Sequence, residues 1–312
     1  MENTNVVYDI LIVGGGPGGL SAALYAGRSE MKTLLLEEAF LGGQIATAHS
    51  VENYPGSIEN PSGPKLIERM EQQVQHFGAE IVYDQAQKIE KNGDVFSVQG
   101  MSKKIYQAKT LIVGLGASPR TLGIPGEDEF RGMGVSYCAT CDGAFFKNKV
   151  VAAIGGGDTA LQESAFLTKF ASKVYLIHRR NEFRGAKSLV SQAEKNPRIE
   201  ILLDTVPLRV LGDSTVKGLE IQNKATGETR ILEDVQGVFM FVGNNPNTAL
   251  ITDFVDVDAQ GYVLANADMS TKTPGLFAIG DMIQKPLRQA VTAAADGAIA
   301  AISAEHYIAG LE

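Results

Sequence analysis

Residues 8–19 of the chain read Tyr8-Asp9-Ile10-Leu11-Ile12-Val13-Gly14-Gly15-Gly16-Pro17-Gly18-Gly19. The short apolar run that ends in glycines is typical of a strand buried on both faces of a parallel sheet. The glycines match the pattern GxGxxG. The first permits a tight turn, the second lets the backbone approach a pyrophosphate, and the third allows close helix packing. We therefore expect a strand over 8–13 and a helix that starts at about Pro17.

A second apolar run, residues 32–37, completes a strand–helix–strand unit of about 30 residues. A lone GxGxxG is a weak signal, but this unit gives it the context of a dinucleotide fold. The run ends in Glu37, about 20 residues past Gly16, where a carboxylate can accept hydrogen bonds from ribose hydroxyls. Alternatively Glu37 is only a solvated strand end, or its neighbour Glu38 has the role; position favours Glu37. The predicted contacts of this first nucleotide are Gly14, Gly16, Pro17, Gly19 and Glu37.

The same pattern returns in the second half of the chain. Residues 150–154 are apolar and lead into Gly155-Gly156-Gly157-Asp158-Thr159-Ala160, the GxGxxA form of the fingerprint. Alanine at the last position still allows the helix to pack closely on the strand. We expect a helix from there through about Ala171 and a strand over 173–177. A second dinucleotide is implied.

Basic residues, not a carboxylate, follow the strand at 173–177. His178-Arg179-Arg180 come directly after it, and Arg184 follows shortly. Guanidinium groups bind a 2′-phosphate through bidentate, charge-assisted hydrogen bonds, so this strand end favours NADPH over NADH. The competing interpretation is a solvated basic face. The predicted NADPH contacts are Gly155, Gly157, Asp158, Thr159, Ala160, His178, Arg179, Arg180 and Arg184.

Two cysteines occur, Cys138 and Cys141, in a Cys-x-x-Cys spacing that suits both a redox disulfide and a metal site. Structural zinc generally needs four ligands, and the histidines show no pair at ligand spacing, so we predict redox chemistry and no metal. Inert buried thiols are the other alternative, but the polar, glycine-bounded setting of residues 136–143 is not typical of an apolar core strand. Asp142 follows the second sulfur and could relay protons, or could only cap a helix or turn. The four histidines are His49, His76, His178 and His306.

Length and composition are those of an ordinary globular protein. The 312 residues, 44% of them hydrophobic, are enough for two domains with separate cores. A formal net charge of −8 argues against a nucleic-acid partner, because nucleic-acid affinity depends on clustered lysine and arginine. No apolar run approaches the roughly 20 residues that span a bilayer, and the N-terminal residues lack a basic segment followed by a cleavable apolar stretch. We therefore expect a cytosolic protein without membrane association.

Two kinds of segment predict how the domains are built and joined. Alternating segments at 94–98 and 218–222 indicate antiparallel hairpins, which suggests a β-meander on each domain. The stretches 114–125 and 243–247 are rich in glycine, proline or asparagine and lie outside the periodic segments. We expect the chain to cross between its domains at these two stretches.

Together these motifs resemble those of the bacterial, low-molecular-weight thioredoxin reductases in the pyridine nucleotide-disulfide oxidoreductase family. The resemblance rests on the two fingerprints, on Cys-Ala-Thr-Cys-Asp at 138–142 and on the arginines after the second fingerprint, and it covers essentially the whole chain. Further matching segments are 42–44, 51–56, Gly243 with 246–248, 275–281 and 288–290. Two positions depart from the usual pattern: Gly114-Leu115-Gly116-Ala117 replaces the commoner Ala-Thr-Gly-Ala, and Gly185 stands where alanine is usual.

The resemblance implies an α/β fold of two Rossmann-like, three-layer ββα nucleotide-binding domains. A discontinuous FAD domain would comprise residues 1–118 and 250–312. The NADPH domain, residues 119–249, would be inserted into it and would carry the cysteine pair. The further FAD contacts that the resemblance implies are Gln44, Asn53, Gly280, Asp281, Arg288, Gln289 and Ala290.

The resemblance also implies an activity. Electrons would pass from NADPH through FAD to the Cys138–Cys141 disulfide, and then to oxidised thioredoxin or a thioredoxin-like protein. Cys141 would be nearer the flavin, Cys138 would attack the partner's disulfide, and Asp142 would be the acid–base residue. A homodimer is implied. So is rotation of the inserted domain, because that domain holds both the nicotinamide site and the disulfide while the flavin belongs to the other domain.

Other functions remain as alternatives. A related flavin dithiol oxidase, or a reductase that serves a peroxidase partner, would also retain a flavin-linked cysteine pair. The intact second fingerprint argues against an oxidase, and the absence of an N-terminal extension argues against a fused peroxidase reductase. A non-catalytic redox sensor or NADP-binding regulator belongs to a different class of function.

Overall fold

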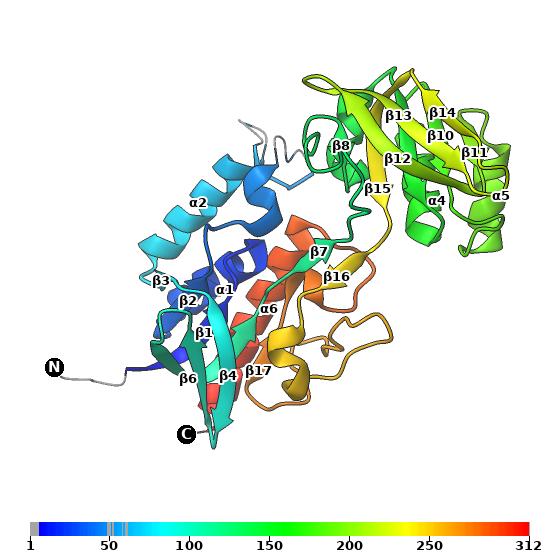
Figure 1. Ribbon diagram of the computed structural model, residues 1–312. Helices are drawn as coiled ribbons and strands as arrows, with labels where there is room; N and C mark the ends of the chain where they lie inside the picture. Colours follow the sequence, from blue (N-terminus) through cyan, green and yellow to red (C-terminus); the bar gives the residue numbers. More distant parts are fainter. Residues whose placement is uncertain (1–5, 49–50, 52, 58, 60–61, 312) are drawn as a thin grey trace. The chain divides into compact units, whose positions relative to one another are not determined.

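The computed structural model describes residues 6–48, 51, 53–57, 59 and 62–311 (Figure 1). His49 and Glu52, which belong to the sequence patterns above, lie outside the described residues. The chain divides into two compact units. The first unit comprises residues 1–118 and 245–312, and the second unit comprises residues 119–244.

A mainly parallel sheet forms the centre of the first unit. Its strands are β1 (Val7–Val13), β2 (Thr33–Glu37), β3 (Glu80–Tyr83), β4 (Ala86–Asn92), β5 (Val95–Gly100), β6 (Ile105–Val113) and β17 (Leu276–Ala278). The order is β3-β2-β1-β6-β5-β4, with β17 paired to β6. β1 lies between β2 and β6 and is parallel to both. Because both faces of β1 are covered, Ile10, Leu11 and Ile12 are fully buried in succession.

Strands β4, β5 and β6 form an antiparallel meander that shares β6 with the parallel part of the sheet. Buried and partly buried residues alternate along β5, where Phe96 and Val98 face the core. This alternation is the pattern of a strand covered on one face. The predicted antiparallel segment at 94–98 is therefore confirmed.

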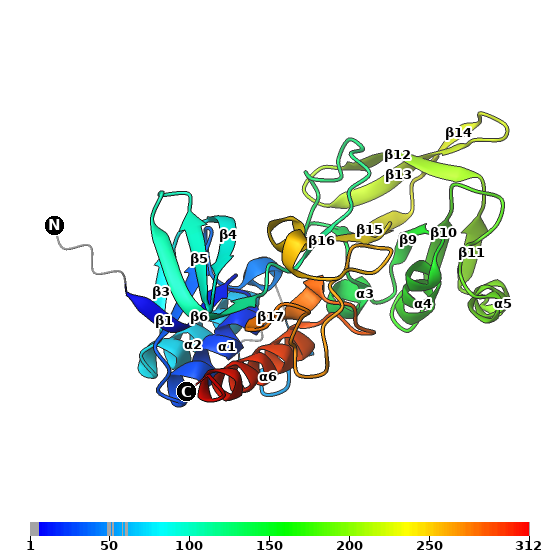
Figure 2. The ribbon, with the colours of Figure 1, turned by 90° about the horizontal axis from the view of Figure 1, so that it is seen from below.

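In the described part of the first unit, the α-helices are α1 (Pro17–Arg28), α2 (Gly63–His76) and α6 (Ala290–Ala309). Figure 2 shows α1 and α6 side by side beneath the strands. Their approach is so close that a Cβ at Gly297 would lie 2.0 Å from the carbonyl oxygen of Gly18. α1 begins at Pro17, as predicted. The short 3-10 helices are η1 (Gly43–Thr47), η3 (Ala249–Phe254) and η4 (Gly280–Met282).

The second unit is built on a parallel sheet of five strands in the order β11-β10-β9-β15-β8. Its strands are β8 (Val135–Ser136), β9 (Val150–Gly155), β10 (Lys173–Ile177), β11 (Ile199–Leu202) and β15 (Val235–Phe241). Its helices are α3 (Ala139–Asp142), η2 (Gly143–Phe146), α4 (Asp158–Leu167) and α5 (Lys187–Lys195).

The faces of this sheet pack into two separate cores. Ala152 and Ile154 of β9 belong to a core shared with a three-stranded antiparallel meander. Val151 and Ala153 belong to a core shared with α4. The meander consists of β12 (Thr205–Gly212), β13 (Val216–Asn223) and β14 (Thr229–Leu232). The predicted antiparallel segment at 218–222 lies in β13, and the layers are meander, sheet and helices.

One predicted boundary is wrong. The helix expected to run through about Ala171 ends at Leu167. The N–H of Lys169 donates to the carbonyl oxygen of Phe166 at 3.0 Å, and the N–H of Phe170 donates to the carbonyl oxygen of Leu167 at 3.0 Å. These i-to-i−3 contacts close a tight turn, so the last residues leave the α-helical pattern.

The chain passes between the units at two short strands, β7 (Ala117–Pro119) and β16 (Asn244–Pro246), which pair with each other. Each unit is a Rossmann-like α/β structure with a parallel sheet, helices and a meander. The predicted fold class is therefore confirmed. Within the described part of the chain, no helix is long and apolar enough to cross a membrane.

Candidate functional site

The first glycine turn connects the end of β1 to Pro17 at the start of α1. A Cβ at Gly14 would lie 2.5 Å from the carbonyl oxygen of Gly114, and a Cβ at Gly19 would lie 1.8 Å from that of Gly14. Both positions therefore exclude a side chain. A Cβ at Gly16, the N-cap of α1, would meet no described atom within 4 Å, and no side chain in the described ranges caps this helix. The space beside Gly16 at the N-terminus of α1 is thus open, as a bound pyrophosphate requires.

Glu37, at the end of β2, lies against this turn. Its Oε2 accepts a hydrogen bond from the N–H of Gly15 at 2.7 Å, and its Oε1 accepts one from the N–H of Ala39 at 3.1 Å. Its neighbour Glu38 instead accepts a hydrogen bond from Nε2 of Gln85 at 2.6 Å. Glu37 is therefore the carboxylate that the fold holds beside the glycine turn.

Asp281 in η4 carries a buried oxygen without a partner. Its Oδ1 makes no hydrogen bond to any residue that the structure describes. Burial raises the pKa of Asp281, while the nearby charges of Lys285 and Arg288 act in the opposite direction. Buried polar atoms are rarely left unpaired in folded proteins, so this oxygen is suited to a donor supplied by a ligand.

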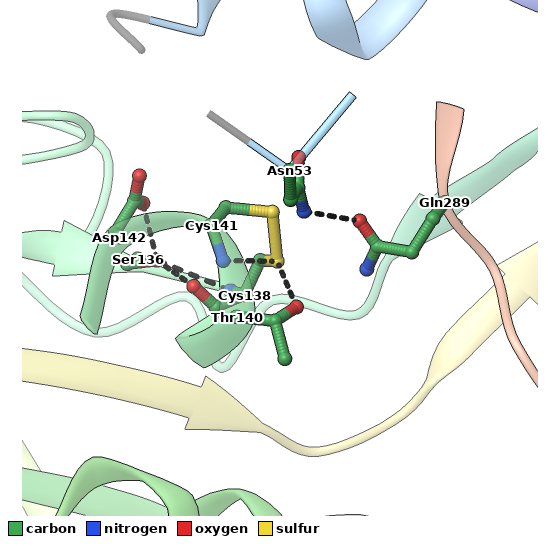
Figure 3. Close-up of a disulfide and its surroundings, with 7 residues drawn as sticks. All are labelled: Asn53, Ser136, Cys138, Thr140, Cys141, Asp142 and Gln289. Carbon is green, nitrogen blue, oxygen red and sulfur yellow. Dashed lines mark hydrogen bonds between the residues drawn. A yellow bond between two sulfur atoms is a disulfide. The ribbon is translucent and has the colours of Figure 1, made fainter. Parts of the chain in front are cut away.

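Several other residues predicted to contact FAD lie next to Asp281 or bond to residues at the start of α6. The guanidinium of Arg288 donates to the carbonyl oxygen of Asp281 at 3.3 Å and lies 3.8 Å from the ring centre of Tyr262. Oε1 of Gln289 accepts a hydrogen bond from Nδ2 of Asn53 at 3.0 Å (Figure 3). Ala290, the next residue, is the first of α6.

Two further predicted residues, Gly280 and Gln44, hold neighbouring backbone in place. Gly280 has a φ of 74°, which favours glycine, and its N–H donates to Oδ2 of Asp296 at 3.0 Å. Nε2 of Gln44 donates to the carbonyl oxygen of Ala117. Gln44 therefore bonds to the strand at which the chain leaves this unit.

The second glycine turn, in the second unit, repeats the features of the first. A Cβ at Gly155 would lie 2.5 Å from the carbonyl oxygen of Phe241 and 2.6 Å from Cβ of Ala160. Gly157 is the N-cap of α4, and a Cβ there would meet no described atom within 4 Å. Asp158 and Thr159 are exposed in the first turn of α4. This helix end is therefore also open to a pyrophosphate.

The basic residues that follow β10 occupy two different positions. Arg179, Arg180 and Arg184 are exposed, and none of them forms an ion pair with a residue that the structure describes. His178 is buried, and its ring would lie 2.1 Å from a Cβ at Gly156. The three guanidinium groups are thus available to a phosphate, whereas His178 forms part of the wall under the glycine turn.

The environment of His178 disfavours its charged form. Its Nε2 lies 3.0 Å from the carbonyl oxygen of Glu182, and its ring stacks on that of Phe183. Burial lowers the pKa of His178, and the neighbouring arginines lower it further.

Cys138 and Cys141 form a disulfide, with their Cα atoms 5.3 Å apart (Figure 3). Cys138 is the N-cap of α3, and its Sγ accepts a hydrogen bond from the N–H of Cys141 at 3.2 Å. Oγ1 of Thr140 lies 3.4 Å from the same sulfur. The first sulfur therefore sits among donors that can stabilise a thiolate.

Asp142, the last residue of α3, is held by Ser136 of β8. The hydroxyl of Ser136 donates to Oδ2 of Asp142 at 2.6 Å (Figure 3). Burial raises the pKa of Asp142, and the bond from Ser136 lowers it by a smaller amount. A carboxyl group with a raised pKa next to a disulfide is suited to take up and release a proton as the disulfide is reduced.

Several residues of these sites were not predicted. Ser136 contacts Asp142, and Glu163 of α4 lies toward the backbone N–H groups of Ala139 and Thr140. Their spacing in the sequence carries no motif. Asp296, which bonds Gly280, could have been noticed because it is a carboxylate within the alanine-rich first half of helix α6. Within the described ranges, no group of three or more metal-ligating side chains comes together.

Two dinucleotide-type folds and a Cys-x-x-Cys disulfide define a disulfide oxidoreductase that works with nucleotide cofactors. Residues 8–297 match the family described as pyridine nucleotide-disulphide oxidoreductase. The thioredoxin reductase of Peptoclostridium litorale is 48% identical over 99% of this chain and 98% of its own length. The thioredoxin reductase of Mycolicibacterium smegmatis is 40% identical over 99% of both chains. The crystal structure of thioredoxin reductase from Streptococcus pyogenes MGAS5005 superposes with a TM-score of 0.91 at 41% identity, over 98% of this chain and 100% of that one.

The chain belongs to the pyridine nucleotide-disulphide oxidoreductase family, and the full-length relatives place it with the thioredoxin reductases. It is an oxidoreductase whose cofactors are FAD and NADPH. The described residues fit both groups. The unpartnered Oδ1 of Asp281 suits a hydroxyl of a flavin side chain, and the open helix ends at Gly16 and Gly157 suit two pyrophosphates.

Proposed function

We propose that this enzyme reduces the disulfide of oxidised thioredoxin, or of a thioredoxin-like protein, through its own Cys138–Cys141 pair. The observation that carries the proposal is the disulfide itself, at the N-terminus of α3 beside the half-buried carboxyl of Asp142. In the net reaction NADPH, a proton and the partner's disulfide become NADP⁺ and the partner's two thiols. Two electrons are transferred, and the Cys138–Cys141 pair of this chain returns to its oxidised disulfide form at the end of each turnover.

Each cofactor is assigned to one unit. FAD would bind the first unit through the turn at Gly14–Gly19, Glu37 and the η4 segment with Asp281. NADPH would bind the second unit through the turn at 155–160 and the arginines that follow β10. The contrast between Glu37 at one strand end and exposed guanidinium groups at the other supports this assignment, because a carboxylate accepts from ribose hydroxyls and an arginine binds a 2′-phosphate.

The bound flavin supplies a carrier that accepts a hydride from NADPH and passes electrons to a disulfide. This chain's residues supply the dithiol and its protons. Reduction of the Cys138–Cys141 bond leaves two sulfurs that need protons or donors. The N–H of Cys141 already faces Sγ of Cys138, and burial raises the pKa of the nearby Asp142, which favours its protonated form. We assign Cys138 as the sulfur that attacks the partner, Cys141 as the sulfur reached from the flavin, and Asp142 as the acid–base residue.

Rotation of one unit against the other would allow both electron transfers. The second unit carries both the disulfide and the turn assigned to NADPH, and the first unit carries the residues assigned to FAD. The units are joined by two short strands, β7 and β16. Such a link can act as a hinge that presents the nicotinamide and the disulfide to the flavin in turn. A rigid crosslink between the units should therefore stop turnover.

We further propose a homodimer formed through the first unit. Several large apolar side chains of α6 are more than a third exposed, and so is Tyr25 of α1. Tyr25 and Val291 line a pocket of about 380 Å³ that is formed mainly by α1, α2 and α6. Exposed apolar surface of this kind commonly marks a protein interface. The exposed large apolar residues of α6 are Val291, Ile299 and Ile302. Sedimentation analysis tests the dimer, and cell fractionation tests a cytosolic location.

Stopped-flow absorbance tests the function. Mixing the FAD-loaded enzyme with NADPH should bleach the flavin, and oxidised thioredoxin should then restore its colour. In Cys138→Ser and Cys141→Ser the bleaching should persist, but thioredoxin should no longer restore the colour. Return of the colour with oxygen alone at the full rate would indicate a dithiol oxidase. Bleaching of the native enzyme without recovery on addition of thioredoxin would reject thioredoxin as the substrate.

A further inference from the structure

Ser136 occupies an unusual position between the disulfide and Asp142. It is the last residue of β8, and its side chain is 5% exposed. Its Oγ accepts a hydrogen bond from the N–H of Cys138 at 3.1 Å. The same Oγ lies 2.6 Å from Oδ2 of Asp142 and 3.3 Å from the carbonyl oxygen of Cys138 (Figure 3). One hydroxyl thus has three hydrogen-bonding neighbours.

A hydroxyl carries one proton and two lone pairs, so it cannot donate to both oxygens at once. The shorter contact shows that the proton points to the carboxyl of Asp142 when that group is ionised. When Asp142 takes up a proton, the carboxyl can donate to Oγ of Ser136. The hydroxyl proton is then free to turn to the carbonyl oxygen of Cys138. Both charge states of Asp142 keep a hydrogen bond, and the backbone of Cys138 is held in each.

We propose that Ser136 is a positioning residue that serves the acid–base residue Asp142 in both of its protonation states and so sets the pH range of disulfide reduction. The inference rests on the proposed function of Asp142. Ser136 touches neither cofactor nor partner in this scheme, and it acts through the carboxyl beside it. Removal of its hydroxyl would leave the ionised form of Asp142 without the donor at 2.6 Å. The neutral form of Asp142 would lose less hydrogen-bond stabilisation than the ionised form.

The groups around Asp142 support this assignment to Ser136. On α4, which packs against α3, Glu163 is directed to the backbone N–H groups of Ala139 and Thr140. The segments η2 and β15, which lie against α3 and β8, contain no charged residue. Among the described residues, Ser136 is the side chain that lowers the pKa of Asp142, against the larger effect of burial.

The test compares FAD-loaded variants in NADPH-dependent reduction of oxidised thioredoxin across pH. Asp142→Asn should remove one limb of the profile of kcat/KM, and this limb reports the carboxyl. In Ser136→Ala the same limb should move to higher pH by about one unit, a tenfold change in proton affinity. Ser136→Thr keeps the hydroxyl and should return the limb to its native position. Ser172→Ala, which removes a distant hydroxyl bound to the carbonyl oxygen of Lys149, should leave the profile unchanged.

A purely structural role for Ser136 predicts a different result. In that case Ser136→Ala would lower the rate at every pH without moving the limb, and this outcome would overturn the proposal. If Asp142→Asn keeps the native profile, then the role of Asp142 fails and the inference fails with it. If Asp142→Asn removes the limb and Ser136→Ala shifts it, the results support both the role of Asp142 and the role of Ser136.

Should Ser136→Ala fail to fold, infrared spectroscopy of the native enzyme decides. Subtraction of the spectrum of Asp142→Asn isolates the carboxyl band of Asp142. A protonated carboxyl that bonds Ser136 must absorb as a hydrogen-bonded group at low pH. A band at the frequency of a free carboxyl would overturn the proposal.

Discussion

Nζ of Lys285 lies 2.6 Å from Oδ2 of Asp296, and the two side chains are only 9% and 11% exposed. The same oxygen accepts the N–H of Gly280, next to Asp281. This buried pair therefore ties α6 to the segment that presents the unpartnered carboxyl oxygen. The structure gives the pair two functions: it neutralises a charge in the core, and it fixes the η4 segment.

The Lys285–Asp296 pair should be costly to break from one side. Lys285→Met leaves the Asp296 charge buried and unpaired, so we expect the free energy of unfolding to fall by about 3 to 5 kcal/mol. Urea unfolding of the FAD-loaded enzyme measures the change. The control is Lys272→Met, which breaks the exposed pair with Asp256 and should cost at most about 1 kcal/mol. Equal losses in the two variants would contradict the buried character of the first pair.

In the second glycine turn, Gly156 is required for packing, whereas Gly157 is required for nucleotide binding. A Cβ at Gly156 would lie 2.1 Å from the buried ring of His178, so Gly156→Ala should lower stability by about 1 to 3 kcal/mol. Gly157 has an ordinary extended backbone and open space around its Cα, so Gly157→Ala should change stability by less than about 0.5 kcal/mol.

Gly157→Ala should nevertheless weaken NADPH binding, because the new methyl group would occupy the side from which a pyrophosphate approaches. Thermal unfolding and NADPH titration distinguish the two variants. If Gly157→Ala binds NADPH with the native affinity, then the pyrophosphate does not bind beside Gly157.

Arginines 179 and 180 should determine the preference for NADPH. Replacing each with alanine removes a charge-assisted contact to the 2′-phosphate, so KM for NADPH should rise about tenfold per residue while KM for NADH stays nearly constant. Steady-state kinetics with both nucleotides measures this. Arg230→Ala, which removes an exposed arginine from β14 of the same unit, is the matched control. An unchanged KM for NADPH in the Arg179→Ala/Arg180→Ala double variant would refute the phosphate site.

Asp142→Asn should raise stability while it lowers activity. Burial raises the pKa of Asp142 above its usual 3.8, so the folded state binds this proton more tightly than the unfolded chain does. The stability that the protonated carboxyl contributes is fully present below the unfolded-state pKa of about 3.8. It is lost as the pH rises through the higher pKa of the folded state. Asparagine stays neutral, so the variant should melt at a higher temperature than the native enzyme above neutral pH.

This gain in melting temperature should shrink as the pH is lowered toward 4, which calorimetry can follow. Turnover with thioredoxin should fall about a hundredfold in the same variant. A gain that does not depend on pH would show that the carboxyl is not the cause.

Much of the fold could be predicted because its signals are local. The unbroken apolar run of β1 and the glycines after it specify a buried parallel strand and a tight turn within a dozen residues. The end of α4 could not be predicted in this way. Residues 168–171 contain no glycine or proline that would mark a helix end, and the turn is closed instead by backbone hydrogen bonds of Lys169 and Phe170 that carry no sequence motif.

The amino-acid sequence by itself determined two nucleotide folds, the chemical difference between a carboxylate and arginines at their strand ends, and a redox cysteine pair. These follow from residue type and short spacing. Tertiary structure alone decided that Glu37, not Glu38, meets the glycine turn, that His178 is buried under Gly156, and that Ser136 holds Asp142. Side-chain contacts of this kind depend on which strands and helices pack together, because packing sets the direction, burial and charge of each group.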